Sequence, residues 1–553
     1  MSKSLADTLL NEVTIGNLLD LAAERFPQRE ALVHKNERVS FSELRQRANV
    51  VSKSFLRAGI QKRDKVAVWL SNCPEFIYTY MALEKIGAVL VPLNTRFKTV
   101  EFEDITRRAD CVALVTTDHF LKTDFMKMIR QAMPELKGSK PGALQAKNFP
   151  MLKNVIVVSE EKYPGTLDFS TFMASGESYP DSELQKAQSV VVPEDIAFLL
   201  FTAGTTGLPK GVLLTHHATS HHFLIGERQG VTESDRSILF LPLCHIYGLA
   251  TCFLNRLSHG ACVVLQEYFD PEESLKLMVE EKITFMDCVP SNAIMMLNHE
   301  NFPKYQGGLK VRRGLVGGAT VPYTLLVDIV EKMGARGMFQ VYGQTECCGT
   351  TSINVNGDHL ENVAASIGKV MDDFEAKVVA PSTGKVLPYG KDGELLIRGR
   401  ACMRGYYKMP KETAATIDKD GWIHTGDLVR MDEDNYLYFV GRLKDIIMIG
   451  GEPLAPAEVE HFLFTHPKIK DAQVVGVPDP RLEEVPAAFI QLKEREKSSP
   501  EEIMDFCKGK IANYKIPRYV KFVDEFSLTA TGKIQKFKLR EQAINEWSLT
   551  PQE

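Results

Sequence analysis

Short apolar runs rich in β-branched residues alternate with longer segments of helical period along most of this sequence. Runs typical of buried strands are KVAVWL (65–70), AVLVPL (88–93), CVALVTT (111–117), NVIVV (154–158) and ACVVLQ (261–266). Segments of helical period include FPQREAL (26–32) and SELRQRANVVSKSFLRAGI (42–60). This alternation is typical of α/β layers in which helices cover both faces of a largely parallel sheet. The sequence therefore predicts an α/β fold.

The length of 553 residues exceeds a typical domain of about 150 residues several times, so more than one folding unit is expected. Beyond residue 443 the pattern changes to that of a compact α+β unit, in which Pro456 opens a helix and Ser499 with Glu502 forms a capping box. We expect a large N-terminal domain of layered α/β and β subdomains over 1–441. A hinge at 442–444 and a small, mobile C-terminal domain over 445–553 complete the prediction.

The overall charge is nearly balanced, with 66 basic against 71 acidic residues and a net charge of −5. Such a balance argues against nucleic acid as a partner. No apolar run reaches the ~18 residues that a membrane span requires, so no transmembrane segment is expected. The ten cysteines form no CxxC pair, which favours a reducing environment and a cytoplasmic location.

A glycine-rich segment, FTAGTTGLPKGVLLTH (201–216), lies between two apolar runs that are typical of strands. It therefore predicts a hairpin-like loop, not a loop that opens a helix. The Walker A motif is excluded because a leucine and a proline separate the last glycine from the lysine. An ordinary surface turn is one interpretation; the other is a loop whose backbone N–H groups, threonine hydroxyls and lysine wrap a polyphosphate.

The other motifs decide between these two interpretations. The stretch TAGTTGLPKG (202–211) resembles the phosphate-loop signature of the adenylate-forming superfamily, which contains acyl- and aryl-CoA ligases, peptide-synthetase adenylation domains and firefly-type luciferases. The resemblance covers nearly the whole chain, in the family's order. It continues through KIGAVLVPLN (85–94), LPLCHIYG (241–248), GGA (317–319), VYGQTE (341–346), GELLIRG (393–399), GWIHTGDL (421–428), GRLKDIIMIGG (441–451) and TATGKIQK (529–536).

The resemblance implies an enzyme, an AMP-forming acid–thiol ligase of the acyl-CoA synthetase type. Such an enzyme makes an acyl-adenylate from ATP with release of pyrophosphate, and the thiol of coenzyme A then displaces AMP. ATP, Mg²⁺ and coenzyme A are the implied cofactor and co-substrates. The small-molecule substrate is an apolar carboxylic acid, with a fatty acid as first candidate; medium-chain, long-chain, branched and aromatic acids all fit such a pocket.

The resemblance also assigns roles to residues on the nucleotide side. Glu346 would hold Mg²⁺ together with Thr202, and Thr345 would contact the α-phosphate. Tyr342 and Gly343, with Gly318 and Ala319, would receive adenine. The β- and γ-phosphates would be held by Thr202, Gly204, Thr205, Thr206, Gly207 and Lys210.

Further roles fall near the end of the chain and in the predicted acid pocket. Asp427 and Arg442 would bind the ribose, and Lys533 would bridge the carboxylate and the α-phosphate during adenylation. His245 would lie near the carboxylate end of the acyl pocket. By the same resemblance Lys444 is the hinge residue, and the coenzyme A pantetheine would pass Gly450 and Gly451.

Three other functions compete with this one. A stand-alone adenylation enzyme that loads an aryl or fatty acid onto a carrier protein shares every ATP motif and remains the alternative. A luciferase-like oxygenase has no mark of its own in the sequence, and a nucleotide-binding regulator would have lost a catalytic residue.

His217 and His221 have metal-like spacing but no supporting ligand, so a packing role is favoured for them. The oligomeric state, monomer or homodimer, is left open.

Overall fold

The computed structural model describes residues 13–202, 209–319, 321–449, 452–527 and 534–549. The chain divides into two compact units, 1–375 with 398–423 and 376–397 with 424–553. The second unit thus includes residues on the N-terminal side of the predicted hinge at 442–444, and that hinge stays a prediction. The large α/β part and the smaller α+β part confirm the expected fold class.

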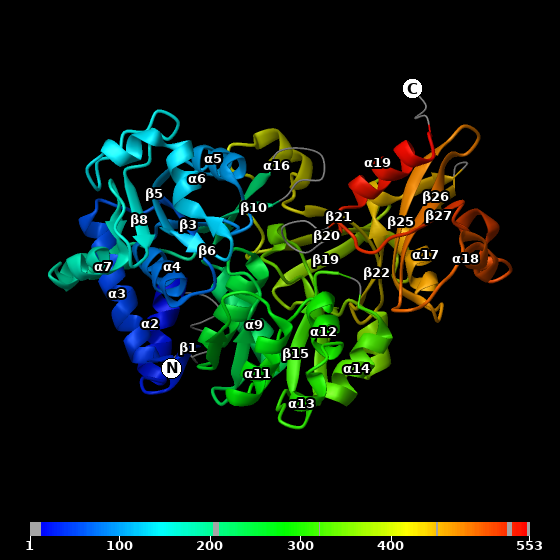
Figure 1. Ribbon diagram of the computed structural model, residues 1–553, viewed down its shortest axis with the longest axis horizontal. Coiled ribbons are helices and arrows are strands. Elements are labelled where there is room, and N and C mark those ends of the chain that lie inside the picture. The colour runs from blue at the N-terminus through cyan, green and yellow to red at the C-terminus, as the bar shows by residue number, and fades with distance from the viewer. Residues whose placement is uncertain (1–12, 203–208, 320, 450–451, 528–533, 550–553) are drawn as a thin grey trace. The chain divides into compact units, whose positions relative to one another are not determined.

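Two mixed sheets organise the first unit (Figure 1). The seven-stranded sheet has the order β11 (Lys210–Thr215), β10 (Ile196–Thr202), β4 (Val89–Pro92), β3 (Lys65–Trp69), β5 (Cys111–Thr117), β8 (Asn154–Val158), β9 (Leu167–Asp168). The nine-stranded sheet has the order β18 (Lys369–Val370), β17 (Ser352–Ile353), β16 (Gly337–Tyr342), β15 (Arg313–Gly317), β14 (Phe285–Met286), β12 (Arg236–Leu239), β13 (Cys262–Leu265), β1 (Glu30–His34), β2 (Glu37–Ser40). A small hairpin joins β6 (His119–Phe120) to β7 (Thr123–Asp124).

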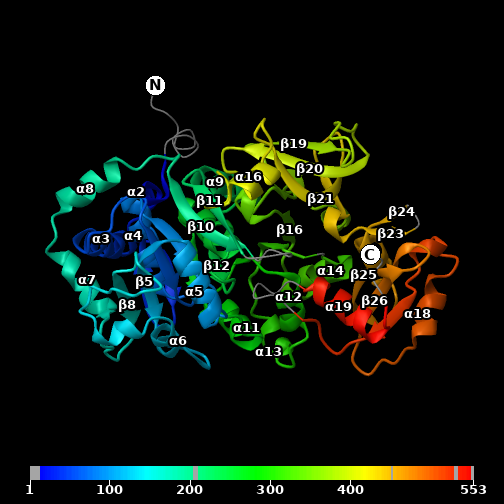
Figure 2. The same cartoon turned by 90° about the horizontal axis from the view of Figure 1, so that it is seen from above.

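Helices connect and cover these strands. In the first half of the unit they are α2 (Ile15–Arg25), α3 (Phe41–Arg57), α4 (Pro74–Ile86), α5 (Thr99–Arg108), α6 (Phe125–Ala132), η1 (Pro134–Gly138), α7 (Phe169–Glu177), α8 (Asp181–Ser189) and α9 (Ala218–Gln229). They are followed by η2 (Tyr247–Leu254), α10 (Asn255–Ser258), α11 (Pro271–Glu280), α12 (Pro290–Leu297), α13 (Phe302–Gln306), α14 (Tyr323–Met333), η3 (Thr345–Cys347), α15 (Leu360–Ala365) and α16 (Pro410–Thr416). Helix α3 packs against both α4 and α7, as Figures 1 and 2 show.

The core of the seven-stranded sheet explains why its strands read as continuous apolar runs. Helices cover the parallel strands β3, β4, β5 and β8. Consecutive side chains of these strands are therefore buried, whichever face of the sheet they point to. Trp69 at the end of β3 stacks on Phe102 of α5, with 4.7 Å between ring centroids. Phe125 of α6 meets the same indole edge-on at 4.6 Å.

One predicted helical segment is wrong. Helix α2 ends at Arg25, and residues of the stretch 26–32 enter strand β1 instead. Ala31, Leu32 and Val33 are all buried, and Leu32 pairs in parallel with Val263 of β13. Because a run of three buried apolar residues fits either a strand or a helix face, tertiary pairing decided the outcome here.

The second unit contains two further sheets. Strands β19 (Phe374–Val379), β20 (Asp392–Gly399), β21 (Ile423–Met431) and β22 (Leu437–Arg442) form one of them. The other has the order β24 (Glu452–Leu454), β23 (Ile447–Ile449), β26 (Glu483–Leu492), β25 (Ile469–Asp479), with β27 (Tyr519–Phe522) paired to β26. The helical elements are η4 (Leu443–Asp445), α17 (Pro456–Leu463), α18 (Pro500–Cys507), η5 (Asn513–Lys515) and α19 (Lys536–Glu546).

The helix starts predicted for this part of the sequence, at Pro456 and Ser499, are confirmed. Helix α17 begins at Pro456, and its Val459 and Leu463 are buried, as the helical period indicates. Helix α18 is capped by Ser499, whose side chain accepts from Glu502 N. The Glu502 carboxylate accepts hydrogen bonds from Lys468 and Ser498 instead of closing the capping box. None of the helices in the described ranges has the length and hydropathy that a membrane crossing requires.

Candidate active site

Several predicted site segments meet at one edge of the nine-stranded sheet. Strands β12, β14, β15 and β16 run parallel, so their carboxyl ends point the same way. The segment LPLCHIYG follows β12, CVPSN follows β14, GGA ends β15 and GQTE follows β16. Ligands of open α/β sheets bind outside the carboxyl ends of the strands. This edge is therefore the candidate site.

The turns after β15 and β16 leave backbone uncovered. Gly318 has φ +82°, a conformation that favours glycine, and Ala319 beside it is exposed. A Cβ on Gly343 would lie 2.5 Å from the Gly349 oxygen, so no side chain fits there. Tyr342 is partly exposed one residue earlier. Since Gly317 pairs with Val341, these two turns are neighbours, as an adenine site between them requires.

The glycine-rich segment joins two antiparallel strands, as the sequence predicts. Strand β10 ends at Thr202 and β11 begins at Lys210, and these two residues pair across the hairpin. The Thr202 hydroxyl donates to the Lys210 carbonyl over 3.4 Å. The predicted phosphate ligands between the strands, Gly204, Thr205, Thr206 and Gly207, lie outside the described residues.

A tyrosine that the sequence analysis did not select lies between Lys210 and Glu346. The Tyr406 hydroxyl donates to Glu346 Oε1 over 2.8 Å, and Lys210 Nζ lies 4.7 Å from the centroid of its ring. Burial and the Glu346 carboxylate raise the pKa of Tyr406, so the phenol stays protonated and donates. Thr345 and Glu346 lie in the short turn η3. The structure thus brings Lys210 and Glu346 together around Tyr406, and Thr202 pairs with Lys210.

The predicted acid pocket lies among the segments that follow β12, β14 and β15. His245 is half-buried and precedes η2, a π-helical stretch of a kind often found at functional sites. The Tyr247 hydroxyl donates to the Cys288 carbonyl over 3.2 Å and so joins two of these segments. On α12, which follows the CVPSN segment, Met296 is fully buried while Met295 is half-exposed.

The remaining described site residues belong to the second unit. Asp427 of β21 is 3% exposed and pairs with Arg442 of β22, with 3.0 Å between Arg442 Nε and Asp427 Oδ1. Lys444 lies in the turn η4, where burial lowers its pKa. Three predicted residues, Gly450, Gly451 and Lys533, lie outside the described residues.

Comparison with known proteins assigns the family. The description "AMP-binding enzyme" matches residues 19–407, and "AMP-binding enzyme C-terminal domain" matches residues 458–533. The chain belongs to the AMP-binding enzyme family. Within that family it is an AMP-forming acid–thiol ligase of the acyl-CoA synthetase branch.

Three relatives illustrate the match to this AMP-binding enzyme. The mouse protein "Medium-chain acyl-CoA ligase ACSF2, mitochondrial" is 37% identical over 97% of this chain and 88% of its own. The crystal structure of the anthranilate CoA ligase AuaEII in complex with anthranoyl-AMP has a TM-score of 0.85 and 26% identity, and covers 99% and 100% of the two chains. The o-succinylbenzoate CoA synthetase MenE from Bacillus subtilis has a TM-score of 0.77 and 28% identity. The match covers 96% of this chain and 99% of that one.

The histidines before and within α9 lie against partners from several parts of the chain. Among the described residues, no group of three or more His, Cys, Asp or Glu side chains could hold a metal ion. His221 Nδ1 lies 2.9 Å from Asp373 Oδ2, and its Nε2 lies 2.7 Å from the Thr350 carbonyl. The other three histidines lie near separate partners: His216 near Glu84, His217 near Glu194 and His222 near Cys348.

The His221–Asp373 pair should stabilise the segment that carries Glu346. Burial alone would raise the pKa of Asp373, but His221, a backbone hydrogen bond and the Arg228 charge together outweigh burial, and the pKa lies below its ordinary value. We expect Asp373→Asn to lower the free energy of unfolding at neutral pH by about 1–3 kcal/mol. A lowered carboxyl pKa contributes stability that is full above the unfolded-state pKa of about 4 and is lost as the pH falls through the lower folded-state pKa. The difference between parent and variant should therefore begin to shrink near pH 4 and vanish only in stronger acid. Denaturant unfolding at several pH values measures both effects.

The neighbouring Asp372 provides the matched control. Its side chain is 75% exposed and pairs with Arg228 over 3.0 Å. Because the Asp372 carboxylate is largely in water, its pairing with Arg228 contributes little, and Asp372→Asn should change the free energy of unfolding by less than about 1 kcal/mol. Equal losses in both variants, or a loss that persists in acid, would contradict the assigned role of Asp373.

The adjacent cysteines after Glu346 are not nucleophiles. Cys347 and Cys348 are buried, and the pKa of each thiol lies well above its ordinary value. For Cys347 the first cause is a hydrogen bond with Cys402, and for Cys348 it is burial. Since the thiolate is the reactive form, these side chains pack and do not react.

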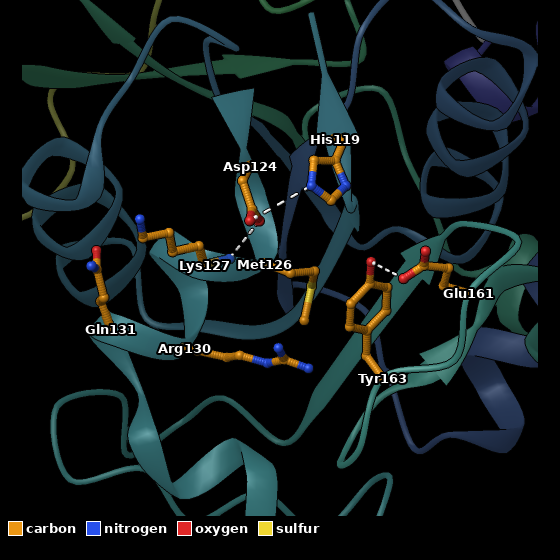
Figure 3. Close-up of a pocket in the computed structure, with 8 residues that line it drawn as sticks. All are labelled: His119, Asp124, Met126, Lys127, Arg130, Gln131, Glu161 and Tyr163. Carbon is orange, nitrogen blue, oxygen red and sulfur yellow. Dashed lines mark hydrogen bonds and ion pairs between the residues drawn. The ribbon is translucent and has the colours of Figure 1, made fainter. Parts of the chain in front are cut away.

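A surface hollow of about 490 Å³ lies elsewhere in the first unit, beside the β6–β7 hairpin (Figure 3). It contains none of the predicted site residues. Its charges are mixed, since both basic (Lys127, Arg130) and acidic (Asp124, Glu161) residues line it, and Arg130 lies over the ring of Tyr163 at 5.2 Å. The reaction is therefore not assigned to this hollow, which is lined by His119, Asp124, Met126, Lys127, Arg130, Gln131, Glu161 and Tyr163.

Proposed function

We propose that this enzyme activates an apolar carboxylic acid, with a fatty acid as first candidate, and transfers it to coenzyme A. The carboxylate attacks the α-phosphate of ATP, the bond to the β-phosphate breaks, and pyrophosphate leaves with acyl-adenylate formed. The thiol then attacks the acyl carbon and AMP leaves. The first step needs little covalent help from the protein; it needs alignment of the reactants and neutralisation of charge on phosphate oxygens.

The observation that carries this proposal is the convergence of Lys210, Tyr406 and Glu346 beside the hairpin that holds the glycine-rich loop. A cation and an anion close to a phosphate-loop sequence are what a polyphosphate with a divalent cation requires. Lys210 and Thr202, with the loop residues 204–207, would bind the β- and γ-phosphates. Thr345 would contact the α-phosphate.

Mg²⁺ fits the donor set at this position. The Glu346 carboxylate and the Thr202 hydroxyl supply oxygen, the ligand type that Mg²⁺ prefers. Among the described residues no group of three or more His, Cys, Asp or Glu side chains could hold a metal ion, so nucleotide oxygens and water would complete the shell. When bound, Mg²⁺ supplies charge neutralisation on the phosphate oxygens.

The other residues would receive the rest of the nucleotide and the acid. Tyr342 offers its ring to adenine across the open turns at Gly318, Ala319 and Gly343. Asp427, oriented by Arg442, would accept hydrogen bonds from the ribose hydroxyls. Lys533 would place a positive charge between the carboxylate and the α-phosphate, with His245 near the carboxylate. Gly450 and Gly451 would lie along the pantetheine, and Lys444 would be the hinge.

The choice of a fatty acid rests on two supports. The mouse relative is named for medium-chain acids, while the solved neighbours are named for anthranilate and o-succinylbenzoate. The segments around His245 are lined by buried apolar side chains such as Leu243, Leu249 and Met296. Aromatic acids are the competing class, and loading of a carrier protein is the competing second step.

Product analysis tests this function. With ATP, Mg²⁺, coenzyme A and a panel of straight-chain, branched and aromatic acids, we expect AMP, pyrophosphate and acyl-CoA in equal amounts. Omitting coenzyme A should leave acyl-adenylate formation and stop thioester formation. Release of ADP with phosphate instead of AMP with pyrophosphate would contradict the proposal, as would turnover that needs a carrier protein and ignores coenzyme A.

We also propose a cytoplasmic location and a monomer or homodimer. The ten cysteines of the described ranges are all free, which fits a reducing compartment. Mass measurement in solution distinguishes the monomer from the dimer.

A further inference from the structure

Tyr406 lies where a single side chain can act on both charged groups of the phosphate end. Tyr406 is buried, with only 7% of its surface exposed to solvent. Its hydroxyl donates to Glu346 Oε1 over 2.8 Å, and its ring lies under Lys210 Nζ at 4.7 Å. Since Oε1 accepts from the phenol, Oε2 is the carboxylate oxygen left for another ligand, and among the described residues no hydrogen bond to it is found.

The backbone around Tyr406 is held on three sides. Residue 406 forms a bridge with Val212, and Tyr407 N donates to the Gly211 carbonyl over 2.7 Å, so the segment adds to the edge of β11. Tyr406 N donates to Thr413 Oγ1 over 2.9 Å. On the other side Met403 N donates to the Glu346 carbonyl over 2.8 Å. The same short segment therefore ties the lysine strand to the glutamate turn.

The turn into Tyr406 requires glycine. Gly405 has φ +136°, and a Cβ there would meet Thr413 Cγ2 at 2.8 Å. A larger residue would force this segment away from the Thr413 side chain or out of its conformation. Local geometry thus fixes the backbone from which the Tyr406 side chain projects.

We propose that Tyr406 is a positioning residue for adenylation: it presents Glu346 Oε2 to Mg²⁺ and holds the Lys210 ammonium above its ring, ready for the phosphates. The inference rests on the proposed function, because it takes the Mg²⁺ role of Glu346 and the phosphate role of Lys210 from there. It adds a residue that no motif assigned. The hydroxyl and the ring have separable tasks, one for the metal and one for the lysine.

Tyr406→Phe removes only the hydroxyl. A charge-assisted hydrogen bond is lost, so we expect the free Mg²⁺ concentration for half-maximal pyrophosphate release to rise about 10-fold. At saturating Mg²⁺ the kcat should stay within about 3-fold of the parent. A second readout needs no turnover: by calorimetry without acid, the gain in ATP affinity that Mg²⁺ provides should fall by a similar factor of about 10.

Tyr406→Leu removes the ring as well. The Lys210 ammonium then loses its cation–π contact, so ATP binding should weaken about 3- to 10-fold further, even without Mg²⁺. The KM for ATP should rise while kcat changes less. This pattern differs from that of Tyr406→Phe, which should leave the affinity for metal-free ATP unchanged.

Tyr407 offers a matched control in the neighbouring position. Its hydroxyl donates to Asp110 over 2.7 Å, and Lys65 and Lys408 lie over its ring at 5.4 Å and 5.3 Å. Tyr407→Phe therefore loses the same kind of hydrogen bond to a carboxylate at a distance from the phosphate end. It should leave the Mg²⁺ dependence unchanged. Melting curves of the three variants show that each is folded.

The outcomes separate the inference from the proposed function. If the parent releases pyrophosphate with Mg²⁺ and Tyr406→Phe shows the same Mg²⁺ dependence as Tyr407→Phe, the positioning role is overturned and the function stands. If Tyr406→Phe lowers kcat and leaves the Mg²⁺ dependence unchanged, the role is likewise overturned. A parent that forms neither AMP nor pyrophosphate overturns the proposed function itself.

Discussion

Replacing Lys533 by alanine should lower the rate of acyl-adenylate formation by at least about 10², because it removes a positive charge that acts on the transition state. Lys533 lies in the segment TATGKIQK, outside the described residues, and its role follows from the family motif. Thioester formation from supplied acyl-adenylate should survive, since the bond to the β-phosphate is then already broken. Pyrophosphate release and acyl-CoA formation from synthetic acyl-adenylate measure the two steps separately.

Lys538 is the matched control for this experiment. It lies in α19, is exposed, and belongs to the same C-terminal part of the chain. Lys538→Ala makes the same change in charge and should leave both half-reactions within about 2-fold of the parent. If Lys533→Ala slowed the two half-reactions equally, Lys533 would be a structural residue and its catalytic role would be wrong.

The sequence alone predicted the scaffold of the site well because its signals were local. The strand runs at 65–70, 88–93, 111–117, 154–158 and 261–266 are all strands of the two large sheets. The glycine-rich segment was predicted as a hairpin from its two flanking runs, and Thr202 does pair with Lys210. In both cases a buried strand and a turn leave a signature within a few residues.

Tyr406 could not be found in this way. The hydrogen bond that gives it a role spans 60 residues of sequence, and nothing in RGYYKMP distinguishes this tyrosine from Tyr407 beside it. Both residues have a carboxylate partner and a nearby lysine, so only the tertiary structure shows which carboxylate belongs to the candidate site. The error at 26–32 has a related cause, since pairing of β1 with β13 joins segments more than two hundred residues apart.

The division of the chain also depends on tertiary contacts. The change of pattern near residue 443 marks the start of the C-terminal part, yet the second compact unit also takes in 376–397 and 424–441. Strands β20 and β21 have residues in both units. Compactness and mobility are therefore separate questions: contacts define the units, while a hinge is defined by which torsions change during the reaction.

A proline at position 444 should separate the two half-reactions. By the proposed roles, Lys533 and the Gly450–Gly451 pair would each act on the same acyl-adenylate in turn. One fixed arrangement would not serve both, so we expect a few hinge torsions to change between the steps. Lys444 lies in the short turn Leu443–Asp445, where Ile446 N donates to the Leu443 carbonyl over 3.4 Å. Proline fixes its own φ near −65° and restricts Leu443 before it.

We expect Lys444→Pro to keep pyrophosphate release and to slow acyl-CoA formation by about 10² or more, because the torsions that change between the steps are no longer free. Lys444→Ala removes the same ammonium and leaves the torsions free, so it should be mild in both steps. The two variants together distinguish loss of a side chain from loss of a hinge. If Lys444→Pro converts supplied acyl-adenylate to acyl-CoA at the parent rate, no hinge operates at 442–444. If both variants slow the thioester step equally, the ammonium matters and the torsions do not.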